Sequence, residues 1–425
     1  MSDVKEPGGP DDYDPLAVFQ AMAAGPSSEE LYGRFALCRA EAPVHELIRS
    51  GDTQEGSSVK GDALDDMAEL VGWGPDPTFM TMSFEAAQKV LGSPNMSSSG
   101  YYERVSPVFG HSMIEMDEPE HKEYRSLIAQ AFTRKAMEEW ESDLARPLVN
   151  GHIDTFAERG RADLVRELTF PYPIEVIGGM LGLPPEDLDQ YRRWAVELLE
   201  IIGDMELGFA ASLSLAAYFG RLISERRVDP RNDLISVIAH ADKDGLKLSD
   251  DEIIAFLRLL LPAGAETTTR SLGNLILGLL MHPDQLEALR SDRSLMFPAI
   301  EEGLRWETSL VSVGRTPKLD TEICGTGIPG GSSVTVSLGA ANRDETRWEE
   351  PDKFDIFRER KAHIAFGYGP HTCIGMHLAR METQVALTAL LDRLPNLRLD
   401  VDAEVQPKIL GQGLRSPTHL PVLFG

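Results

Sequence analysis

A glycine-rich loop that holds one cysteine and runs directly into a helical pattern constrains this chain more than any other segment. In the stretch AFGYGPHTCIGMHLAR, which begins at Ala365, three glycines surround Cys373. Leu378, Met381 and Val385 then recur at helical spacing. A helix that begins directly after Cys373 directs unpaired backbone N–H groups and the positive end of its dipole at the sulfur, and both lower the pKa of a thiol. We therefore expect Cys373 to be a thiolate that can bind a metal ion.

The cysteine also allows two other interpretations. A lone cysteine in a turn is more often a buried structural residue than a ligand. A zinc site is the second alternative, because His371 and His377 flank Cys373 within four residues. Structural zinc takes four ligands, usually several cysteines, and the other two cysteines, Cys38 and Cys324, are distant in the sequence. The zinc interpretation is therefore weak, and the residues by themselves leave the structural one open.

Composition limits the partners and the compartment. The 425 residues include 41 basic and 68 acidic side chains, a formal charge of −27, which argues against nucleic acid or an anionic membrane surface as the main partner. Three cysteines are too few for a disulfide framework and indicate a reducing compartment. The N-terminal residues show no signal-peptide pattern, and Arg258 and Pro262 interrupt the most apolar run well short of the ~20 residues of a membrane span. We expect a soluble, cytoplasmic protein without a membrane anchor.

Helical patterns dominate the chain, and strand patterns are short. Apolar residues recur at three- and four-residue spacing in segments 27–41, 84–92, 119–131, 134–158, 184–226, 249–289 and 374–394. Strand patterns occur at Thr78–Met82, Ser333–Leu338 and Pro421–Phe424. The composition of residues 1–15 predicts disorder, and that of residues 49–62 predicts a mobile polar loop or insertion. The sequence therefore predicts one mainly helical domain with a small β portion over residues 16–425.

Six residues of the cysteine loop form a spaced motif, namely Phe366, Gly367, Gly369, His371, Cys373 and Gly375. The motif resembles the haem-binding signature of the cytochrome P450 family. The resemblance implies that Cys373 is the proximal thiolate ligand of the iron of haem b, and that His371 donates a hydrogen bond to a haem propionate. It also implies that Phe366 packs near the sulfur, and that Gly367 and Gly375 let the loop approach the haem closely. A thiolate ligand favours cleavage of the O–O bond over reversible oxygen binding.

A second motif lies in the apolar helical segment LLLPAGAETTTRSLG. Pro262 cannot donate a backbone hydrogen bond inside a helix, so we expect a kink there, and the hydroxyl of Thr267 can reach the carbonyl of Ala263. One interpretation is a core helix weakened by glycine, with a cluster of threonines. The segment also resembles the oxygen-activation helix of the cytochrome P450 family. That resemblance implies that Ala263 and Gly264 border the haem. It further implies that Glu266 relays protons and that Thr267 supports the cleavage of bound oxygen.

A pair of charged residues lies before the cysteine loop. Glu302 and Arg305 are three residues apart on one helical face and can pair, although Glu301 could pair with Arg305 instead. In this position they resemble the Glu-x-x-Arg element of the family, and Arg358 resembles the third member of that group. The resemblance implies a buried structural cluster that holds the cysteine loop.

His121 and Arg125 lie one turn apart on one helical face. Taken by themselves, they indicate a solvated surface. In their order along the chain they resemble the His-x-x-x-Arg pair that binds haem propionates, and Arg315 resembles the strand arginine that joins the pair. The resemblance thus implies a single-domain cytochrome P450 fold, with the haem between the oxygen-activation helix and the cysteine-loop helix.

The family resemblance implies a bacterial-type monooxygenase that inserts one oxygen atom of O₂ into an apolar compound such as a terpenoid, a steroid-like or an aromatic molecule. An unactivated C–H bond offers no proton to a side-chain base, so a cofactor must supply the oxidant. The sequence contains no nucleotide-binding glycine motif or ferredoxin cysteine cluster. We therefore expect electrons from NAD(P)H through a separate reductase and a ferredoxin or flavodoxin. Family positions place the substrate against Leu260, Ala263, Leu310, Val311, Val313 and Leu410.

Two alternatives keep the haem and change the function. A peroxide-driven peroxygenase would have no need of Glu266 and Thr267, so their presence argues against it. A haem sensor would bind the same cofactor without turnover.

Overall fold

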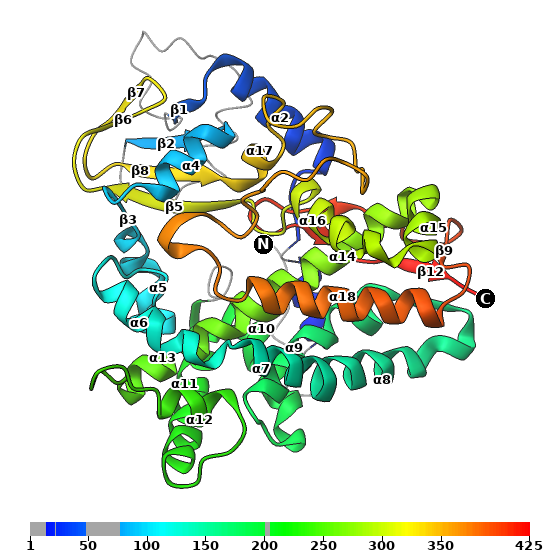
Figure 1. Cartoon of the computed structure of the whole chain (residues 1–425), viewed down its shortest axis with the longest axis horizontal. Helices are drawn as coiled ribbons and strands as arrows, with labels where there is room; N and C mark the ends of the chain where they lie inside the picture. Colours follow the sequence, from blue (N-terminus) through cyan, green and yellow to red (C-terminus); the bar gives the residue numbers. More distant parts are fainter. Residues whose placement is uncertain (1–13, 22, 48–76, 200–204) are drawn as a thin grey trace, which may run out of the picture.

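The structure is a computed structural model that describes residues 14–21, 23–47, 77–199 and 205–425. It is mainly helical with small β-sheets, as the sequence predicts (Figure 1). The predicted loop at 49–62 lies outside the described residues. So does the predicted disorder of residues 1–15, apart from Asp14 and Pro15, and Pro15 already begins the first helix.

The α-helices have the following bounds: α1 Pro15–Ala21, α2 Ser28–Glu41, α4 Phe84–Gly92, α5 Tyr102–Phe109, α6 Glu120–Ile128, α7 Arg134–Trp140, α8 Arg146–Phe156, α9 Pro171–Met180, α10 Leu188–Leu199, α11 Met205–Val228, α12 Leu234–Ala239, α13 Asp250–Leu261, α14 Thr267–Met281, α15 Pro283–Ser291, α16 Met296–Trp306, α17 Leu338–Asn342 and α18 Met376–Arg393. Two π-helical turns, Glu141–Ala145 and Pro262–Glu266, lie between helices, and a third, Val165–Thr169, precedes α9.

Five strands form the largest sheet, in the order β1, β2, β8, β5, β3. Their bounds in that order are Val44–Leu47, Thr78–Thr81, Ser333–Ser337, Ser312–Pro317 and Met96–Ser97. β2 and β8 are parallel, and the other neighbours are antiparallel. Both of these strands are fully buried, and α4 and α17 pack beside the sheet at the top of Figure 1. The smaller sheets join β4 Arg161–Asp163, β12 Pro421–Leu423 and β9 Arg398–Leu399; β10 Ile409–Leu410 and β11 Ser416–Pro417; and β6 Thr321–Ile323 and β7 Thr326–Ile328.

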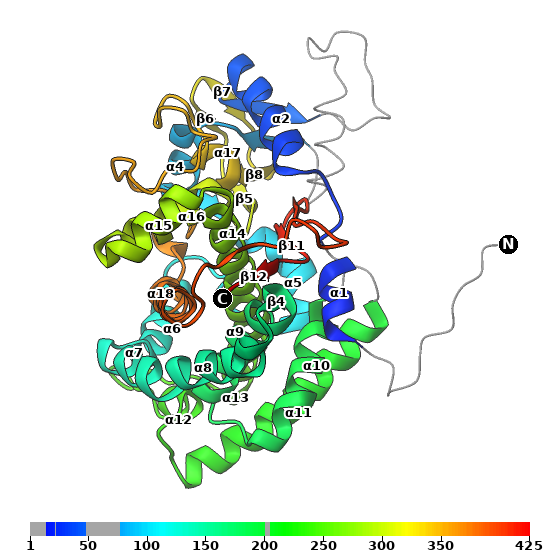
Figure 2. The ribbon, with the colours of Figure 1, turned by 90° about the vertical axis from the view of Figure 1, so that its right-hand side faces the viewer.

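α13 and α14 form one long helical segment through the centre of the molecule (Figure 2). α13 begins at a capping box, in which the side chains of Ser249 and Glu252 each accept the other residue's backbone N–H. The π-helical turn Pro262–Glu266 interrupts the segment, and α14 is buried against α9, α16 and α18. Side chains near the turn are therefore enclosed by several helices at once.

The predicted helical segments are confirmed, but three of them are subdivided. Segment 134–158 comprises α7, the π-helical turn Glu141–Ala145 and α8. Segment 184–226 comprises α10 and α11. Segment 249–289 comprises α13, α14 and α15, because Pro283 fits the first turn of a new helix better than the interior of a continuing one. The predicted strands are confirmed as β2, β8 and β12.

Among the described residues, α11 is the helix that is long and apolar enough to cross a membrane, with a mean hydropathy of 1.3 over 18 residues. It packs against α10, α12 and α13, and near its end the buried Arg226 donates to Asp233 at 2.6 Å. Core helices pass the same test of length and composition, so the finding is weak evidence for a membrane span.

Candidate functional site

Backbone contacts hold the cysteine loop directly before α18 (Figure 1). The N–H of Cys373 donates to the carbonyl of Phe366 at 2.9 Å. Gly367 and Gly369 have φ angles of +72° and +75°, which other residues rarely adopt. A Cβ atom at Gly369 would also lie 2.4 Å from the carbonyl oxygen of Leu91, so close packing against α4 requires this glycine.

Solvent can reach the side chain of Cys373, but its surroundings do not favour the anion. Burial raises the pKa of the thiol, and the N–H of Gly375 and the charges of Arg125 and Arg380 offset this only in part. The backbone donor at the helix start lowers the pKa of Cys373, as the sequence predicts, but desolvation has the larger effect and the net shift is upward. A coordinating metal cation would deprotonate the thiol outright.

Four basic side chains gather beside the cysteine loop: His121 and Arg125 from α6, Arg315 from β5, and His371 from the loop itself. The rings of His121 and His371 stack with their centroids 3.9 Å apart. Nη2 of Arg125 donates to the carbonyl of Thr372 at 2.6 Å, and Arg315 is buried. The structure thus brings together all four residues that the sequence assigns to the propionates.

The two arginines of this group lack the carboxylate partners that buried cations normally have. Within the described part of the chain, neither Arg125 nor Arg315 forms an ion pair, while Nδ1 of His121 lies 3.3 Å from Glu118. Nε2 of His121 is buried without a hydrogen-bond partner. Burial and the neighbouring positive charges lower the pKa of His371 to about 3, and burial also lowers that of His121. Such a site is suited to an anion with more than one negative charge.

The π-helical turn shapes the middle of the central helix. Oγ1 of Thr267 donates to the carbonyl of Ala263 at 2.7 Å, as the sequence predicts, and Oγ1 of Thr268 donates to Gly264 at 2.8 Å. The predicted distortion at Pro262 takes the form of this wider turn, a feature that is frequent at functional sites. Ala263 is exposed although residues on either side of the turn are buried, so this face of the helix borders accessible space.

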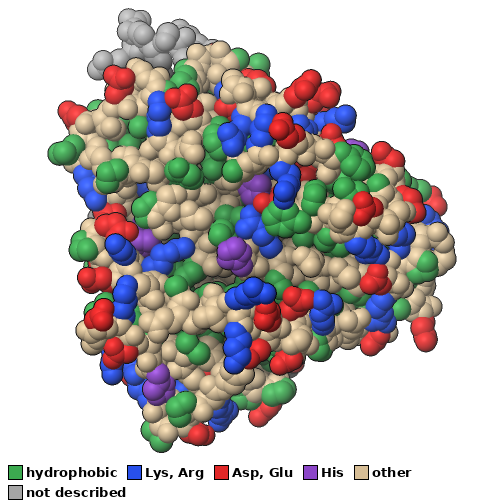
Figure 3. Space-filling view, viewed as in Figure 1, with side chains coloured by type: hydrophobic (Ala, Val, Ile, Leu, Met, Phe, Trp, Pro, Cys, Tyr) green, Lys and Arg blue, Asp and Glu red, His purple; other side chains and the backbone are tan. Residues whose placement is uncertain are grey.

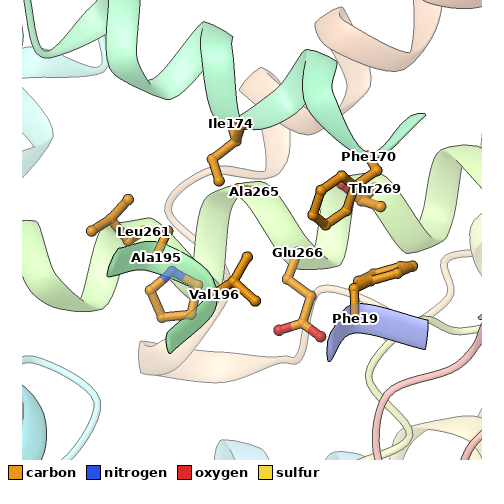
Figure 4. A pocket seen from close by; sticks show the side chains of 10 residues that line it. Phe19, Phe170, Ile174, Ala195, Val196, Leu261, Ala265, Glu266 and Thr269 are labelled. Carbon is orange, nitrogen blue, oxygen red and sulfur yellow. The ribbon is translucent and has the colours of Figure 1, made fainter. Parts of the chain in front are cut away.

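Glu266 lies on the opposite face and does not meet Thr267. Its Oε1 accepts from Nε and Nη2 of Arg270 at 3.0 and 2.5 Å, and Arg270 also donates to Ser416 at 3.1 Å. Figure 4 shows the Glu266 carboxylate beside Phe19 of α1, in a cavity of about 30 Å³ that Thr269 and apolar side chains of α9, α10 and α13 also line. That volume is sufficient for one or two water molecules.

Comparisons with known proteins agree with this geometry. The family model described as Cytochrome P450 matches residues 217–418 of this chain. Cytochrome P450 107B1 of Saccharopolyspora erythraea is 41% identical over 297 residues, which cover 69% of this chain and 72% of that protein. Cytochrome P450 monooxygenase PikC of Streptomyces venezuelae is 35% identical over 398 residues, which cover 91% of this chain and 88% of that protein. The chain belongs to the cytochrome P450 family.

A solved structure also resembles this P450 over most of its length. The crystal structure of CYP109E1 from Bacillus megaterium in complex with corticosterone has a TM-score of 0.80 and 30% sequence identity, and the match covers 94% of this chain and 100% of that one. The protein is therefore a cytochrome P450 monooxygenase with the mainly helical fold of its bacterial relatives.

Membership of the family implies a haem cofactor, and the residues of this P450 fit one. Cys373 is accessible at the start of α18, and Ala263 is accessible on the central helix, which packs against α18. The unpartnered Nε2 of His121 and the unpaired guanidinium groups of Arg125 and Arg315 could receive two propionates. A thiol donor and cations without counter-ions are the chemistry that a haem requires from its protein.

The predicted charge cluster is present in this P450. Nε and Nη2 of Arg305 donate to the two carboxylate oxygens of Glu302, both at 2.8 Å, and Nε of Arg358 lies 3.4 Å from the same carboxylate. The alternative pairing of Glu301 with Arg305 does not form, because Glu301 accepts hydrogen bonds from Arg380 of α18.

The bond between Glu301 and Arg380 joins α16 to the cysteine-loop helix. Nε and Nη2 of Arg380 donate to the two carboxylate oxygens at 2.7 and 2.9 Å, and the guanidinium lies 4.7 Å from the ring centre of Phe366. Burial raises the pKa of Glu301, but His363, whose Nε2 lies 3.5 Å away, and the hydrogen bonds from Arg380 outweigh burial and bring the pKa to about 2. This pair has no local signal in the sequence, because its members are 79 residues apart.

The predicted substrate-contact residues fall into two groups. Leu310, Val313 and Leu410 are half-buried, so part of each side chain is accessible to a ligand. Val311 is 1% exposed and packs in a core cluster with Tyr32 of α2. The prediction for Val311 is therefore wrong, because no part of it can contact a substrate.

Two predicted residues of the central helix face other helices. A Cβ atom at Gly264 would lie 3.0 Å from Ile177 of α9, so packing against α9 explains this glycine better than contact with haem. Leu260 is 7% exposed and belongs to the core. Leu259 is half-buried and lies four residues before Ala263 on the same face. Helical periodicity alone could have identified Leu259 in place of Leu260.

Proposed function

We propose that this P450 binds haem b through the thiolate of Cys373 and oxidises an apolar organic substrate with one atom of O₂. The bound haem supplies the activation of oxygen, which no side chain can provide for an unactivated C–H bond. One observation carries the proposal: an accessible cysteine lies beside four buried or half-buried basic groups, of which the two arginines have no carboxylate partner among the described residues. His121, Arg125, Arg315 and His371 are the groups that would bind the two propionates.

The rest of the cysteine loop would position the haem. We assign Phe366, Gly367 and Gly375 to this task, because the carbonyl of Phe366 accepts from the N–H of Cys373 and a Cβ atom at Gly375 would lie 3.9 Å from the sulfur. Ala263 lies on the accessible face of the central helix. We assign the charge cluster of Glu302, Arg305 and Arg358 a structural role, because its three members satisfy one another and nearby backbone carbonyls.

We assign Thr267 and Glu266 different roles in proton transfer, on two faces of the helix. We assign Thr267 a hydrogen bond on the oxygen-binding side, because its hydroxyl lies beside the accessible Ala263. We assign Glu266 the uptake of protons from the small cavity behind the helix, where Arg270 holds the carboxylate in place. The π-helical turn separates the two sites, so water molecules or a rotation of Glu266 would have to connect them.

The substrate that the site favours is an apolar compound of steroid or terpenoid type. Leu259, Leu310, Val313 and Leu410 offer partly accessible apolar surface. The structural relative CYP109E1 binds corticosterone, which supports a substrate of that size.

Electrons would come from NAD(P)H through a separate reductase and a ferredoxin or flavodoxin. Basic and acidic side chains are interspersed on the face that Figure 3 shows, so charge does not mark a docking site on this face. The acidic balance of the chain argues against nucleic acid as a partner. We further propose that residues 16–425 form one domain and that the protein is cytoplasmic.

Turnover with purified partners tests the proposal. The holoprotein, a surrogate ferredoxin with its reductase, and NADH should convert an apolar test compound such as testosterone to a product that contains one more oxygen atom. With ¹⁸O₂ the label should appear in the product. A product labelled from water instead would contradict the assigned reaction.

The same assay separates the two alternatives. A peroxygenase would form product with hydrogen peroxide alone and at a rate that the electron partners do not increase. A sensor would bind ligands at the haem and consume no NADH under any of these conditions.

A further inference from the structure

Ser98 is a buried serine whose hydroxyl contacts a residue of the haem site. It is 1% exposed and directly follows β3. Its Oγ lies 3.2 Å from Nε2 of His371, one of the four groups that we assign to the propionates. The motif of the cysteine loop does not include Ser98, and the proposed function gives it no role.

The backbone position of Ser98 offers its hydroxyl another use, which the structure does not make of it. Ser98 is the N-cap residue of the short 3₁₀ helix Ser99–Tyr101. Serine is favoured at such positions because its side-chain oxygen accepts a backbone N–H of the helix that follows. The side chain of Ser98 forms no such bond, so its hydroxyl is available to His371.

Asp117 holds Ser98 in place and connects it to α6. Its Oδ1 accepts the backbone N–H of Ser98 at 3.0 Å, and its Oδ2 accepts from Oγ of Ser97 at 2.6 Å. The carbonyl of Asp117 accepts the backbone N–H of His121 at 2.8 Å, in the first turn of α6. The backbone that positions Ser98 is therefore joined to the helix that carries His121.

The hydrogen bond runs from the serine to the histidine. A buried hydroxyl needs an acceptor for its proton, and Nε2 of His371 is its only hydrogen-bond partner among the described residues. Ser98 therefore donates, and Nε2 accepts through its lone pair. A neutral imidazole carries one N–H group, so the proton of His371 is on Nδ1.

Nδ1 is the ring nitrogen that can meet a propionate. It forms no hydrogen bond with a residue that the structure describes, and it is not sealed from solvent. The ring also stacks on His121, which gives it a second fixed contact. With the proton on Nε2 instead, Nδ1 would present a lone pair to the anion, and the two groups would repel each other.

We infer that Ser98 is a positioning residue that fixes the tautomer of His371, so that Nδ1 of His371 donates to a haem propionate. The inference rests on the proposed haem site and adds to it a residue that acts through His371. A donor that is already oriented loses less freedom when its ligand binds, so the bond between Ser98 and His371 strengthens haem binding.

Nitrogen NMR of the holoprotein tests the tautomer directly. The reduced haem with carbon monoxide bound is diamagnetic, so ¹⁵N-labelled histidine shows which ring nitrogen of His371 carries the proton. The signals that disappear in His371→Gln identify the residue. We expect a protonated Nδ1 and an unprotonated Nε2 in the wild-type protein. A proton on Nε2, alone or together with one on Nδ1, would overturn the inference.

Two variants of nearly the same shape isolate the hydroxyl of Ser98. Ser98→Thr keeps it and Ser98→Val lacks it. Haem transfer to apomyoglobin should be about 2-fold to 10-fold faster from Ser98→Val than from Ser98→Thr, the range for one neutral hydrogen bond. Ser332→Ala is the matched control and should keep the wild-type rate, since the hydroxyl of this buried serine has no partner among the described residues. Equal rates for the two Ser98 variants would overturn the inference.

A double-mutant cycle shows whether Ser98 acts through His371, and it also serves if the larger side chains prevent folding. Ser98→Ala should accelerate haem transfer from the wild-type protein and have no further effect in the His371→Ala background, because the group that it positions is then absent. The same acceleration in both backgrounds would mean that Ser98 stabilises the fold by itself, and the inference would be wrong.

These measurements use bound haem and need neither substrate nor electron partners. A protein that binds haem and oxidises nothing would contradict the proposed reaction and leave the role of Ser98 intact. A haem protein with the proton of His371 on Nε2 would contradict the role of Ser98 alone. A protein that binds no haem would contradict both.

Discussion

Thr267 and Glu266 are neighbours in the sequence, but their side chains lie on different faces of the central helix. Thr267 lies beside the accessible Ala263, whereas the carboxylate of Glu266 is bonded to Arg270 and lines a small cavity. A family motif assigns both residues to proton delivery without distinguishing their positions. In the structure, Thr267 can contact bound oxygen and Glu266 can contact water behind the helix. We therefore make a separate prediction for each residue.

Thr267→Ala should leave haem binding intact and divert electrons to hydrogen peroxide, because the hydroxyl on the oxygen-binding side is lost. The amount of product formed per NADH consumed should fall by about 10-fold or more. This factor is smaller than the rate enhancement that a positioned proton donor usually contributes. Thr268→Ala is the matched control, since Thr268 makes the same bond to a backbone carbonyl and is buried. An unchanged product yield in Thr267→Ala would remove Thr267 from the reaction.

Arg270→Leu should destabilise the protein by about 3 to 5 kcal/mol, because it leaves the buried Glu266 carboxylate without its partner. The double variant with Glu266→Leu should recover most of this loss, since neither charge is then buried. Chemical unfolding followed by circular dichroism measures both values. A double variant no more stable than the single one would show that the ion pair is not the cause.

His121→Ala should weaken haem binding by ~10-fold or more while the ligation by Cys373 stays unchanged, because it removes a donor whose Nε2 has no partner within the protein. The rate of haem transfer to apomyoglobin measures this loss. Arg134→Gln, which alters an exposed pair on α7, should not change the rate. A transfer rate equal to that of the control would argue against a propionate site at His121.

At the scale of whole elements, the contact between α16 and α18 supports the cysteine loop. The Glu301 carboxylate has a pKa of about 2 in the folded protein, below its ordinary value of 4.5. A carboxylate with a depressed pKa stabilises the fold above its unfolded pKa, and this contribution disappears as the pH falls from about 4.5 toward 2. The shift corresponds to about 3 kcal/mol at neutral pH.

Glu301→Gln should therefore lower stability at pH 7 and have a much smaller effect near pH 2, because the wild-type carboxylate is then protonated as well. Urea unfolding between pH 7 and pH 3 should show a shallower pH dependence in the variant. Glu287→Gln, at an exposed position of α15, serves as the control and should follow the wild-type curve. Parallel curves for wild type and Glu301→Gln would mean that Glu301 does not stabilise the contact through its charge.

Elements with strong local signals were predictable from the sequence. The capping box of Ser27 and Glu30 begins α2, and the buried strand β8 follows a clear turn. The interruption at Pro262 was predictable too, but its form as a π-helical turn was not, because that form depends on packing against α9 and α10. Boundaries set by tertiary contacts leave no local pattern.

Within the site, the motifs located Cys373, the basic cluster and Thr267, since each motif has fixed spacing. The pairing of Glu266 with Arg270 has a signal in the sequence, which is the spacing of four residues. No signal in one sequence could reveal the bond between His371 and Ser98, which joins residues 273 apart. The upward shift of the thiol pKa of Cys373 was likewise invisible, because burial depends on the whole fold.

At the scale of the whole molecule, the sequence contains no motif that would bind a nicotinamide nucleotide or an iron–sulfur cluster. NADH alone should therefore give no turnover, and a ferredoxin with its reductase should restore it. Following NADH absorbance with and without these partners checks this prediction. Substrate-dependent NADH oxidation by the purified chain alone would contradict it.

The central claim is that the sulfur of Cys373 ligates a haem iron in this protein. The most direct measurement is the difference spectrum of the purified, reduced protein with and without carbon monoxide. The account predicts the red-shifted absorbance band of a haem with a thiolate ligand, and its loss in Cys373→Ser. A spectrum typical of a nitrogen ligand, the survival of the band in Cys373→Ser, or the absence of any haem would contradict it.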